Sequence, residues 1–242
     1  MFDGGSTTAG SVTEIGGIRN YAYQFEEYVR GIKMNALSDG WSSRQRFVII
    51  VGKAGQTLAD SLAKFDDRAA ARQAVESLIS LGHRHIAVIG GQRLYSDICR
   101  MRWEGVCDML HAHGLSIDPE LDYATVYFSP EGGFDGTTEL LDRGREFTAL
   151  FAMSDLMAIG AFRALKDRGL EVPGDVSVIG FDGLPVDAYL VPRLTTVDQP
   201  TAAMAQRGLE LLLDAIENGS EATHEAVPFT LLYRESTGKA RT

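Results

Sequence analysis

The sequence predicts an α/β protein in which a parallel sheet carries helices on both faces. From about residue 47 onward, short β-branched runs alternate with longer segments of helical periodicity. This alternation is the pattern of strands joined by crossover helices. The strand-like runs are also mainly apolar, as expected of strands that are buried on both sides.

Each predicted strand is short and is bounded by polar residues or glycine. The clear strands are 47–51 (FVIIV), 85–89 (HIAVI), 149–152 (ALFA) and 176–180 (VSVIG), with a further strand-like run at 124–127. Strands of four to six apolar residues suit a sheet that is covered on both faces.

Helical periodicity fills the segments between these strands. The predicted helices are 24–37, 67–81, 97–113, 156–168 and 200–217. Gly82 and Gly169 follow two of them, at positions where a left-handed residue commonly ends a helix. Asp155 is expected to cap the helix that follows it, and Ser96 or Asp97 the helix at 97–113.

Composition narrows the class of protein. The chain has 242 residues, 45% of them hydrophobic, and a formal net charge of −10. An acidic chain repels the phosphate backbone, so by itself it is not expected to bind nucleic acid. No apolar run approaches the ~20 residues of a membrane span, and the start MFDGGSTTAGS lacks the features of a signal peptide, so we expect a cytoplasmic protein with no membrane partner.

Motifs of catalysis and metal binding are not found in the sequence. It has no phosphate-binding loop, no G-x-S-x-G elbow and no Cys/His nucleophile arrangement, so an enzyme is not expected. His83 and His85 lack an evident third ligand, and no metal or other cofactor is predicted. Cys99 and Cys107 are expected to be reduced thiols.

Arg102 is a first candidate for ligand binding. On the helix 97–113 it lies near the middle of an apolar arc, whereas Arg100 falls on the opposite side. A guanidinium amid apolar side chains is costly unless it meets acceptors, so Arg102 should face a ligand or a buried carboxylate. A structural ion pair is the alternative to ligand contact.

Asp182 is the second candidate, because it directly follows the predicted strand VSVIGF. Ligand groups of open α/β sheets gather at the carboxyl ends of strands. A carboxylate at such a position can accept hydrogen bonds from two neighbouring hydroxyls. An ordinary turn aspartate before Gly183 is the alternative.

Three blocks of the chain resemble the lactose-repressor/galactose-repressor (LacI/GalR) family of bacterial transcription regulators, in the same order. They are 66–91 (DDRAAARQAVESLISLGHRHIAVIGG), 147–200 (FTALFAMSDLMAIGAFRALKDRGLEVPGDVSVIGFDGLPVDAYLVPRLTTVDQP) and 234–238 (RESTG). The resemblance implies a two-lobed periplasmic-binding-protein-like fold of type I with a small ligand between the lobes. It implies an N-terminal lobe of residues 1–83 with 199–219, and a C-terminal lobe of 84–198 with 220–242.

The sequence departs from the family pattern near its start. The resemblance calls for a helix-turn-helix headpiece, and no matching or basic segment occurs here. It also calls for about two further strand–helix units before Asp66, where only 65 residues are available, so the N-terminal lobe is predicted to be incomplete.

The resemblance also implies roles for individual residues. The arginine of RMRWEG that matches the family's effector-gripping position is Arg102, and Asp182 matches an aspartate that binds sugar hydroxyls. Phe128 matches an aromatic that stacks on the ligand, with core packing as the alternative. Ser154 stands where many relatives carry asparagine.

Four further residues complete the predicted ligand set. Asp67 and Gln199 match positions at the ligand cleft, although Asp67 can instead cap its helix. Tyr21 and Tyr23 match an aromatic wall only loosely.

The function implied by the resemblance is that of a transcriptional regulator's effector-binding domain, which senses a sugar or related polyol. A homodimer is implied, with DNA contacted only through the headpiece. A solute-binding protein of a transport system and a truncated, non-functional remnant are the alternatives.

Overall fold

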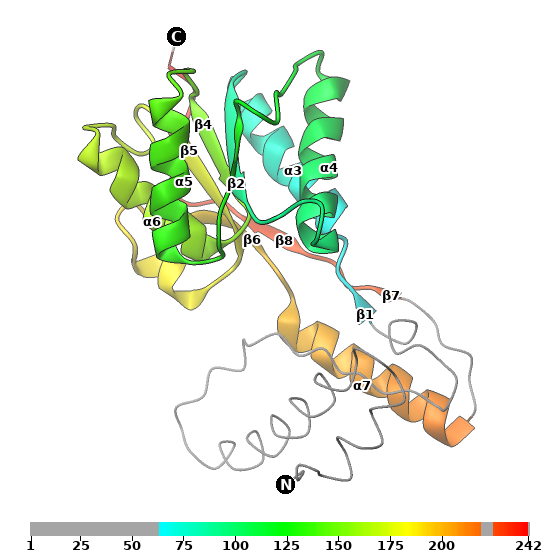
Figure 1. Ribbon diagram of the computed structural model, residues 1–242. Coiled ribbons are helices and arrows are strands. Elements are labelled where there is room, and N and C mark those ends of the chain that lie inside the picture. The colour runs from blue at the N-terminus through cyan, green and yellow to red at the C-terminus, as the bar shows by residue number, and fades with distance from the viewer. Residues whose placement is uncertain (1–62, 219–224, 242) are drawn as a thin grey trace, which may run out of the picture. The chain divides into compact units, whose positions relative to one another are not determined.

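The computed structural model describes residues 63–218 and 225–241, and these fall into two compact units (Figure 1). The described part of the first unit is 63–65, 200–218 and 225–227. The second unit comprises 66–199 and 228–241. The predicted strand 47–51 and helix 24–37 lie outside the described residues.

The second unit is built on a six-stranded sheet. Its strands are β2 (Ile86–Gly90), β3 (Tyr123–Thr125), β4 (Ala149–Ala152), β5 (Ser177–Asp182), β6 (Thr195–Asp198) and β8 (Thr230–Leu232). Their order is β3-β2-β4-β5-β6-β8, and all neighbours are parallel except β6 and β8. The strands predicted at 85–89, 149–152 and 176–180 are confirmed within two residues at each end, and the run at 124–127 forms β3 three residues long.

Two helices cover each face of this sheet. On one face lie α3 (Asp67–Ser80) and α4 (Asp97–Ala112), and on the other α5 (Pro130–Asp142) and α6 (Asp155–Asp167) (Figure 1). All residues of β2 and β4 are buried, because helices shield them from both sides. The predicted α/β class is therefore confirmed.

Helix ends follow local chemistry. Ser96 accepts a hydrogen bond from the backbone N–H of Cys99, which confirms one of the two caps predicted for α4. Gly82 and Gly169 follow α3 and α6 with φ angles of 97° and 71°, as predicted.

Glycines let α5 and α6 approach closely. A Cβ atom added at Gly133 would collide with the carbonyl oxygen of Met157, and one added at Gly160 with that of Pro130. Each helix therefore places a glycine where the backbone of the other passes. A side chain at either position would force the two helices apart.

The boundary between the units lies earlier in the chain than the sequence predicted. The N-terminal lobe was expected to extend to residue 83, but residues 66–83 belong to the second unit. The reason is packing, because α3 lies against α4 and contacts β4 and β6. Residues 220–227 were also assigned to the C-terminal lobe, whereas the part of them that is described, 225–227, belongs to the first unit.

The described part of the first unit combines one helix with a small sheet. Helix α7 spans Thr201–Asn218, and the strands β1 (Ala63–Lys64) and β7 (Glu225–Ala226) pair in parallel. The Nε of Arg207 donates to Glu225 at 2.6 Å, which ties α7 to β7. No described helix is long and apolar enough to span a lipid bilayer.

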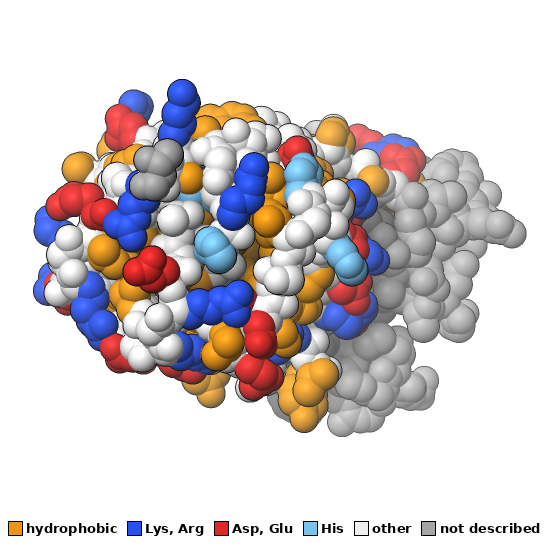
Figure 2. Space-filling view, turned by 90° about the horizontal axis from the view of Figure 1, so that it is seen from above, with side chains coloured by type: hydrophobic (Ala, Val, Ile, Leu, Met, Phe, Trp, Pro, Cys, Tyr) orange, Lys and Arg blue, Asp and Glu red, His pale blue; other side chains and the backbone are white. Residues whose placement is uncertain are grey.

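The end of the second unit at which its parallel strands begin carries mixed charge. Figure 2 looks onto this end and shows basic and acidic side chains next to one another. Several of them form ion pairs, such as Arg168 with Asp142 at 2.6 Å and Arg241 with Asp175 at 2.9 Å. Those residues of the predicted ligand set that the structure describes lie toward the other end.

Candidate functional site

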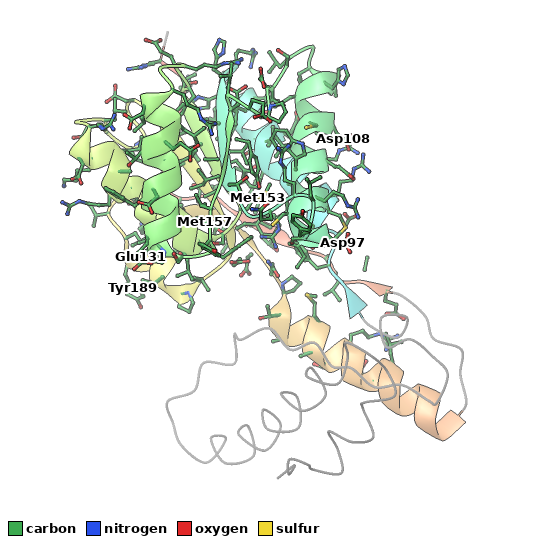
Figure 3. The ribbon with its side chains drawn as sticks, in the orientation of Figure 1. Asp97, Asp108, Glu131, Met153, Met157 and Tyr189 are labelled. Atoms are coloured by element: carbon green, nitrogen blue, oxygen red, sulfur yellow. The ribbon has the colours of Figure 1, made fainter. Side chains whose placement is uncertain are left out.

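Polar side chains gather where the parallel strands end. Asp182 is the last residue of β5, Gln199 directly follows β6, and Met153 directly follows β4. Figure 3 shows Met153 at this end of the sheet, between the two helical layers. Because these strands are neighbours and parallel, their carboxyl ends lie side by side.

Arg102 reaches this edge from α4 and is almost completely buried, with 1% of its surface exposed. Its Nε donates to Asp67 Oδ1 at 2.7 Å, and its Nη1 donates to the carbonyl of Met153. The guanidinium carbon lies 3.6 Å from the centre of the Phe181 ring. Acceptors and an aromatic face thus replace the water that the cation loses on burial.

Asp182 lies next to this arginine, with its Oδ1 at 3.9 Å from Nη1 of Arg102. The side-chain amide of Gln199 donates to the same oxygen at 2.7 Å. The Asp182 side chain is 17% exposed, so it is held by protein groups and still open to a small molecule. The structure therefore brings together four residues of the predicted set, Arg102, Asp67, Asp182 and Gln199.

The backbone at Asp182 is strained. Its φ angle is +127°, in a range that residues other than glycine rarely adopt. Gly183 follows with a φ angle of +76°. Such a conformation costs about 1–3 kcal/mol and persists only where the surroundings enforce it. Only glycine fits at the second position, because a Cβ there would meet the side chain of Asp198.

Asp155, the first residue of α6, stabilises this turn through its side-chain carboxylate. Its Oδ2 accepts hydrogen bonds from the backbone N–H groups of Gly183 at 2.6 Å and Leu184 at 3.0 Å. Its Oδ1 accepts from the hydroxyl of Thr196 at 2.6 Å. The sequence predicted that Asp155 caps its own helix, and this is wrong, because its carboxylate is fully engaged across the sheet edge.

Ser154 is the N-cap of α6 instead. Its hydroxyl accepts from the backbone N–H of Met157 at 3.3 Å, and only 2% of the residue is exposed. The alternative role predicted for Asp67 is also wrong, since Asp66 caps α3 by accepting from Ala69 at 2.8 Å. Asp67 is thereby free of capping and is the partner of Arg102.

Phe128 lies farther along the same edge, after β3, and is 38% exposed. A Cβ added at Gly91 would lie 2.7 Å from its ring, so the ring rests against the end of β2. The structure thus places Phe128 at the rim rather than in the core. Tyr21 and Tyr23 lie outside the described residues.

Sequence reasoning missed two participants at this edge. From the sequence, Phe181 is predicted only to be a buried strand residue. Its sequence neighbours give no indication that the guanidinium of Arg102 packs on its ring. Asp187, in the 3₁₀ helix η3 (Pro185–Tyr189), is fully buried, and its Oδ2 lies 3.9 Å from Nη1 of Arg234. Burial, together with the negative charge of nearby Asp155, raises the pKa of Asp187 to about 9.

The described contacts of His83 and the state of the two cysteines fit structural rather than catalytic roles. His83 is buried and bonded through its ring nitrogens to Thr148 Oγ1 at 2.9 Å and to the carbonyl of Gly238 at 3.1 Å. Cys99 and Cys107 are free thiols. Within residues 63–218 and 225–241, no cluster of three His, Cys, Asp or Glu side chains is arranged to hold a metal ion.

The described part of the chain thus combines a six-stranded α/β sheet with an arginine and two aspartates near the carboxyl ends of its parallel strands. The chain belongs to the periplasmic binding protein-like domain family, which it matches over residues 75–237. Within that family its relatives are LacI/GalR-type regulators. The family predicted from the sequence is confirmed.

One such relative is the HTH-type transcriptional regulator MalR of Streptomyces coelicolor. It is 39% identical over 200 residues, which are 80% of this chain and 56% of MalR. The chain thus spans little more than half the length of this curated relative.

Solved structures of the family match at similar levels. A complex of the transcriptional regulator CelR with cellobiose has a TM-score of 0.68 at 34% identity, covering 73% of this chain and 54% of CelR. A LacI family regulator from Enterococcus faecium with bound ribose has a TM-score of 0.68 at 32% identity, covering 74% and 66%. The lac repressor dimer bound to operator has a TM-score of 0.67 at 30% identity, covering 72% and 59%.

Proposed function

We propose that this chain is the effector-binding part of a transcriptional regulator and that it senses a sugar or related polyol. The observation that carries the proposal is the cluster of Asp182, Gln199, Arg102 and Asp67 at the carboxyl edge of the sheet. Support comes from relatives named as transcriptional regulators, two of which have structures with a sugar bound. These relatives favour a regulator over a transport protein.

The chemistry of the cluster suits a neutral hydroxyl-bearing ligand. Asp182 presents a partly exposed carboxylate whose oxygens accept hydrogen bonds from hydroxyls. Arg102 compensates the charge of two carboxylates, Asp67 and Asp182, and fixes the edge beneath the ligand. With 1% of its surface exposed, Arg102 acts in this proposal mainly by holding the two carboxylates in place.

A thermal-shift and calorimetric titration with ribose, glucose and cellobiose tests the proposal. A ligand that binds only the folded state stabilises it by RT ln(1 + [L]/Kd), about 2.7 kcal/mol at a hundredfold excess over Kd. We expect at least one sugar to raise the melting temperature of the wild type. Asp182→Asn, which removes a charged acceptor, should weaken the affinity for that sugar by tenfold or more. A tenfold change in Kd corresponds to about 1.4 kcal/mol of binding free energy.

The matched control is Asp142→Asn, a carboxylate at the opposite end of the sheet whose side chain is 61% exposed. This variant should bind the sugar as the wild type does. Equal stabilisation of the wild type and of Asp182→Asn would contradict the proposed site. No stabilisation by any of the sugars would contradict sugar sensing.

Dimerisation is the second part of the proposal, since a related structure is a dimer on its operator. An exposed apolar surface in and beside η3 is the candidate interface. Tyr189 is 83% exposed, Val191 94% and Val186 43%, and all three lie within seven residues of one another in the chain. Large apolar side chains that remain this open commonly mark interaction surfaces. Figure 3 shows Tyr189 at the outer margin of the second unit.

Sedimentation velocity measures this directly. The wild type should sediment as a dimer, and the double variant Tyr189→Ser with Val191→Ser should sediment as a monomer. Tyr233→Ser, at a 65% exposed tyrosine outside this surface, is the control and should leave the dimer intact. A monomeric wild type, or a double variant that stays dimeric, would contradict this interface.

A further inference from the structure

One buried acid of the second unit has no role in the proposed sugar site. Asp187 lies in η3, and none of its surface is exposed to solvent. A carboxylate loses its hydration when it is buried, so it must either be compensated by protein groups or bind a proton. The surroundings of Asp187 therefore decide in which form it is present.

A cation approaches Asp187 without forming a close ion pair. Nη1 of Arg234 lies 3.9 Å from Oδ2 of Asp187 and donates its hydrogen bond at 2.7 Å to the carbonyl of Leu194. Burial, followed by the negative charge of Asp155, raises the pKa of Asp187 to about 9, although Arg234 acts in the opposite direction. The carboxyl group of Asp187 is therefore neutral at pH 7.

The neutral Asp187 shares a hydrogen bond with Asp155. Two carboxylates cannot hydrogen-bond to each other, because both are acceptors only. The contact therefore requires one proton, and the neutral carboxyl group supplies it. Asp155 is the first residue of α6 and is also fully buried, so water does not take the place of this donor.

The carboxylate of Asp155 also holds the turn that presents Asp182. It accepts hydrogen bonds from the backbone N–H groups of Gly183 at 2.6 Å and Leu184 at 3.0 Å. The carbonyl of Leu184 in turn accepts from the backbone N–H of Asp187 at 3.1 Å. Asp187 is thus connected to the turn twice, through its backbone and through its side chain.

Loss of the shared proton would place two negative charges in contact inside the protein. Like charges repel strongly where little water screens them. The carboxylate of Asp155 would then turn away from Asp187, and its hydrogen bonds to the turn would lengthen or break. The φ angle of +127° at Asp182 persists only while the surroundings enforce it. The Asp182 carboxylate would therefore lose its fixed orientation.

We propose that Asp155 and Asp187 act as one acid pair whose shared proton fixes the turn on which effector binding depends. Asp187 is then a positioning residue, since it acts on the ligand through Asp155 and Asp182. This proposal rests on the proposed sugar-sensing function, and it adds a dependence of that function on pH.

The pH dependence belongs to the two carboxyl groups. Among the described residues, the charged groups that face Asp187 are Asp155 from α6 and Arg234 from the segment after β8. Because an arginine does not lose its proton in proteins, Arg234 stays a constant influence. The affinity for the effector should therefore fall as the pH rises through the range in which the pair loses its proton.

Calorimetric titration of the full chain with ribose, glucose and cellobiose at pH 7 and pH 10 tests this role. At pH 10, one unit above the pKa of about 9, about a tenth of the molecules keep the proton, so the affinity of the wild type should fall about tenfold. Asp187→Asn keeps a donor toward Asp155 and does not ionise, so it should retain most of its affinity at pH 10. Asp142→Asn, at an exposed carboxylate, is the control and should weaken as the wild type does.

Asp187→Leu separates the hydrogen bond from packing. Leucine has a similar shape but no donor, so this variant should bind the sugar more weakly than Asp187→Asn at pH 7 and should lack the pH dependence of the wild type. Circular dichroism at each pH establishes that the compared proteins are folded. Equal binding by the two variants would overturn the positioning role while leaving sugar sensing intact. A wild type with the same affinity at both pH values, or an Asp187→Asn variant that weakens as the wild type does, would also overturn it.

Carbon-13 NMR of the ligand-free chain tests the acid pair without any sugar. The carboxyl carbon of Asp187 should titrate with a midpoint at about pH 9, and the amide resonances of Gly183 and Leu184 should shift with the same midpoint. In Asp187→Asn these amide resonances should stay unchanged over that range. A carboxyl carbon that titrates at about pH 4, the ordinary value for aspartate, would overturn the pair. A wild type that binds none of the three sugars at pH 7 would overturn the proposed function, and the positioning role with it.

Discussion

The two faces of helix α4 each carry an arginine, one exposed to solvent and the other buried. Arg100 faces outward, with 49% of its side chain exposed, and forms ion pairs with Asp97 and Glu104 at 2.9 Å each. Arg102, two residues later, is 1% exposed and lies on Phe181 with Asp67 at 2.7 Å. The ion-pair distances are nearly the same, so distance alone does not distinguish the two arginines.

Their surroundings do distinguish them. Water screens the outer pairs, and such pairs contribute typically below about 1 kcal/mol. Breaking a buried pair leaves a charge without compensation in a medium of low dielectric constant. The comparison teaches that substitution on the inner face of α4 should cost far more folding stability than substitution on the outer face.

Arg102→Met should give the largest effect. It leaves the buried Asp67 carboxylate without its cation, so we expect a loss of about 3–5 kcal/mol in the free energy of unfolding. Urea denaturation followed by circular dichroism measures this. Adding Asp67→Ala to the variant should recover part of the loss, since the unpaired charge is then gone. A loss below about 1 kcal/mol in the single variant would place Arg102 with the surface arginines.

Asp187→Asn should change how stability depends on pH. The pKa of Asp187 is raised to about 9 in the folded protein, above its ordinary value in the unfolded chain. Between about pH 4 and 9 the unfolded chain loses this proton while the folded one keeps it. The folded state of the wild type is therefore favoured at low pH, and this contribution falls by up to about 1.4 kcal/mol for each pH unit of the window.

Asparagine has nearly the shape of the protonated acid and does not ionise. The variant should thus gain stability relative to the wild type as pH rises from 5 to 8, measured by urea denaturation at each pH. Asp142→Asn, at an exposed carboxylate, is the control and should leave the pH profile unchanged. A constant difference between Asp187→Asn and wild type across this range would contradict an Asp187 that is protonated when folded.

Arg100→Met should give the smallest effect. Its partners are exposed and solvated, so the unfolding free energy should change by less than about 1 kcal/mol and sugar affinity not at all. Parallel urea and calorimetric measurements beside Arg102→Met make the comparison direct. A change as large as that of the inner arginine would show that the outer ion pairs act together as a network.

Much of the fold could be predicted from the sequence because buried parallel strands leave a strong local signal. The runs IAVI and ALFA are apolar without interruption, and β2 and β4 lie at these positions. Arg102 was identifiable for a similar reason, since an arginine within an apolar arc requires acceptors. Asp182 was identifiable because it ends such a run.

The rest depended on contacts between distant segments. Asp66 and Asp67 are adjacent acidic residues, and nothing in the chain around them indicates which one caps α3 and which one meets Arg102. Asp155 opens a helix, and its partners Gly183, Leu184 and Thr196 become neighbours only through the order of the strands. Asp187 looks like a turn residue, and its complete burial follows from packing alone.

The left-handed backbone of Asp182 has a consequence for the energetics of recognition. The unfavourable dihedral is established during folding, when Asp155 binds the two backbone amides that follow. If Asp182 binds the effector as proposed, its backbone is already fixed when the ligand arrives, and little affinity is lost to loop ordering. The free-energy cost of ordering this turn is thus met by folding and does not reduce the free energy of binding.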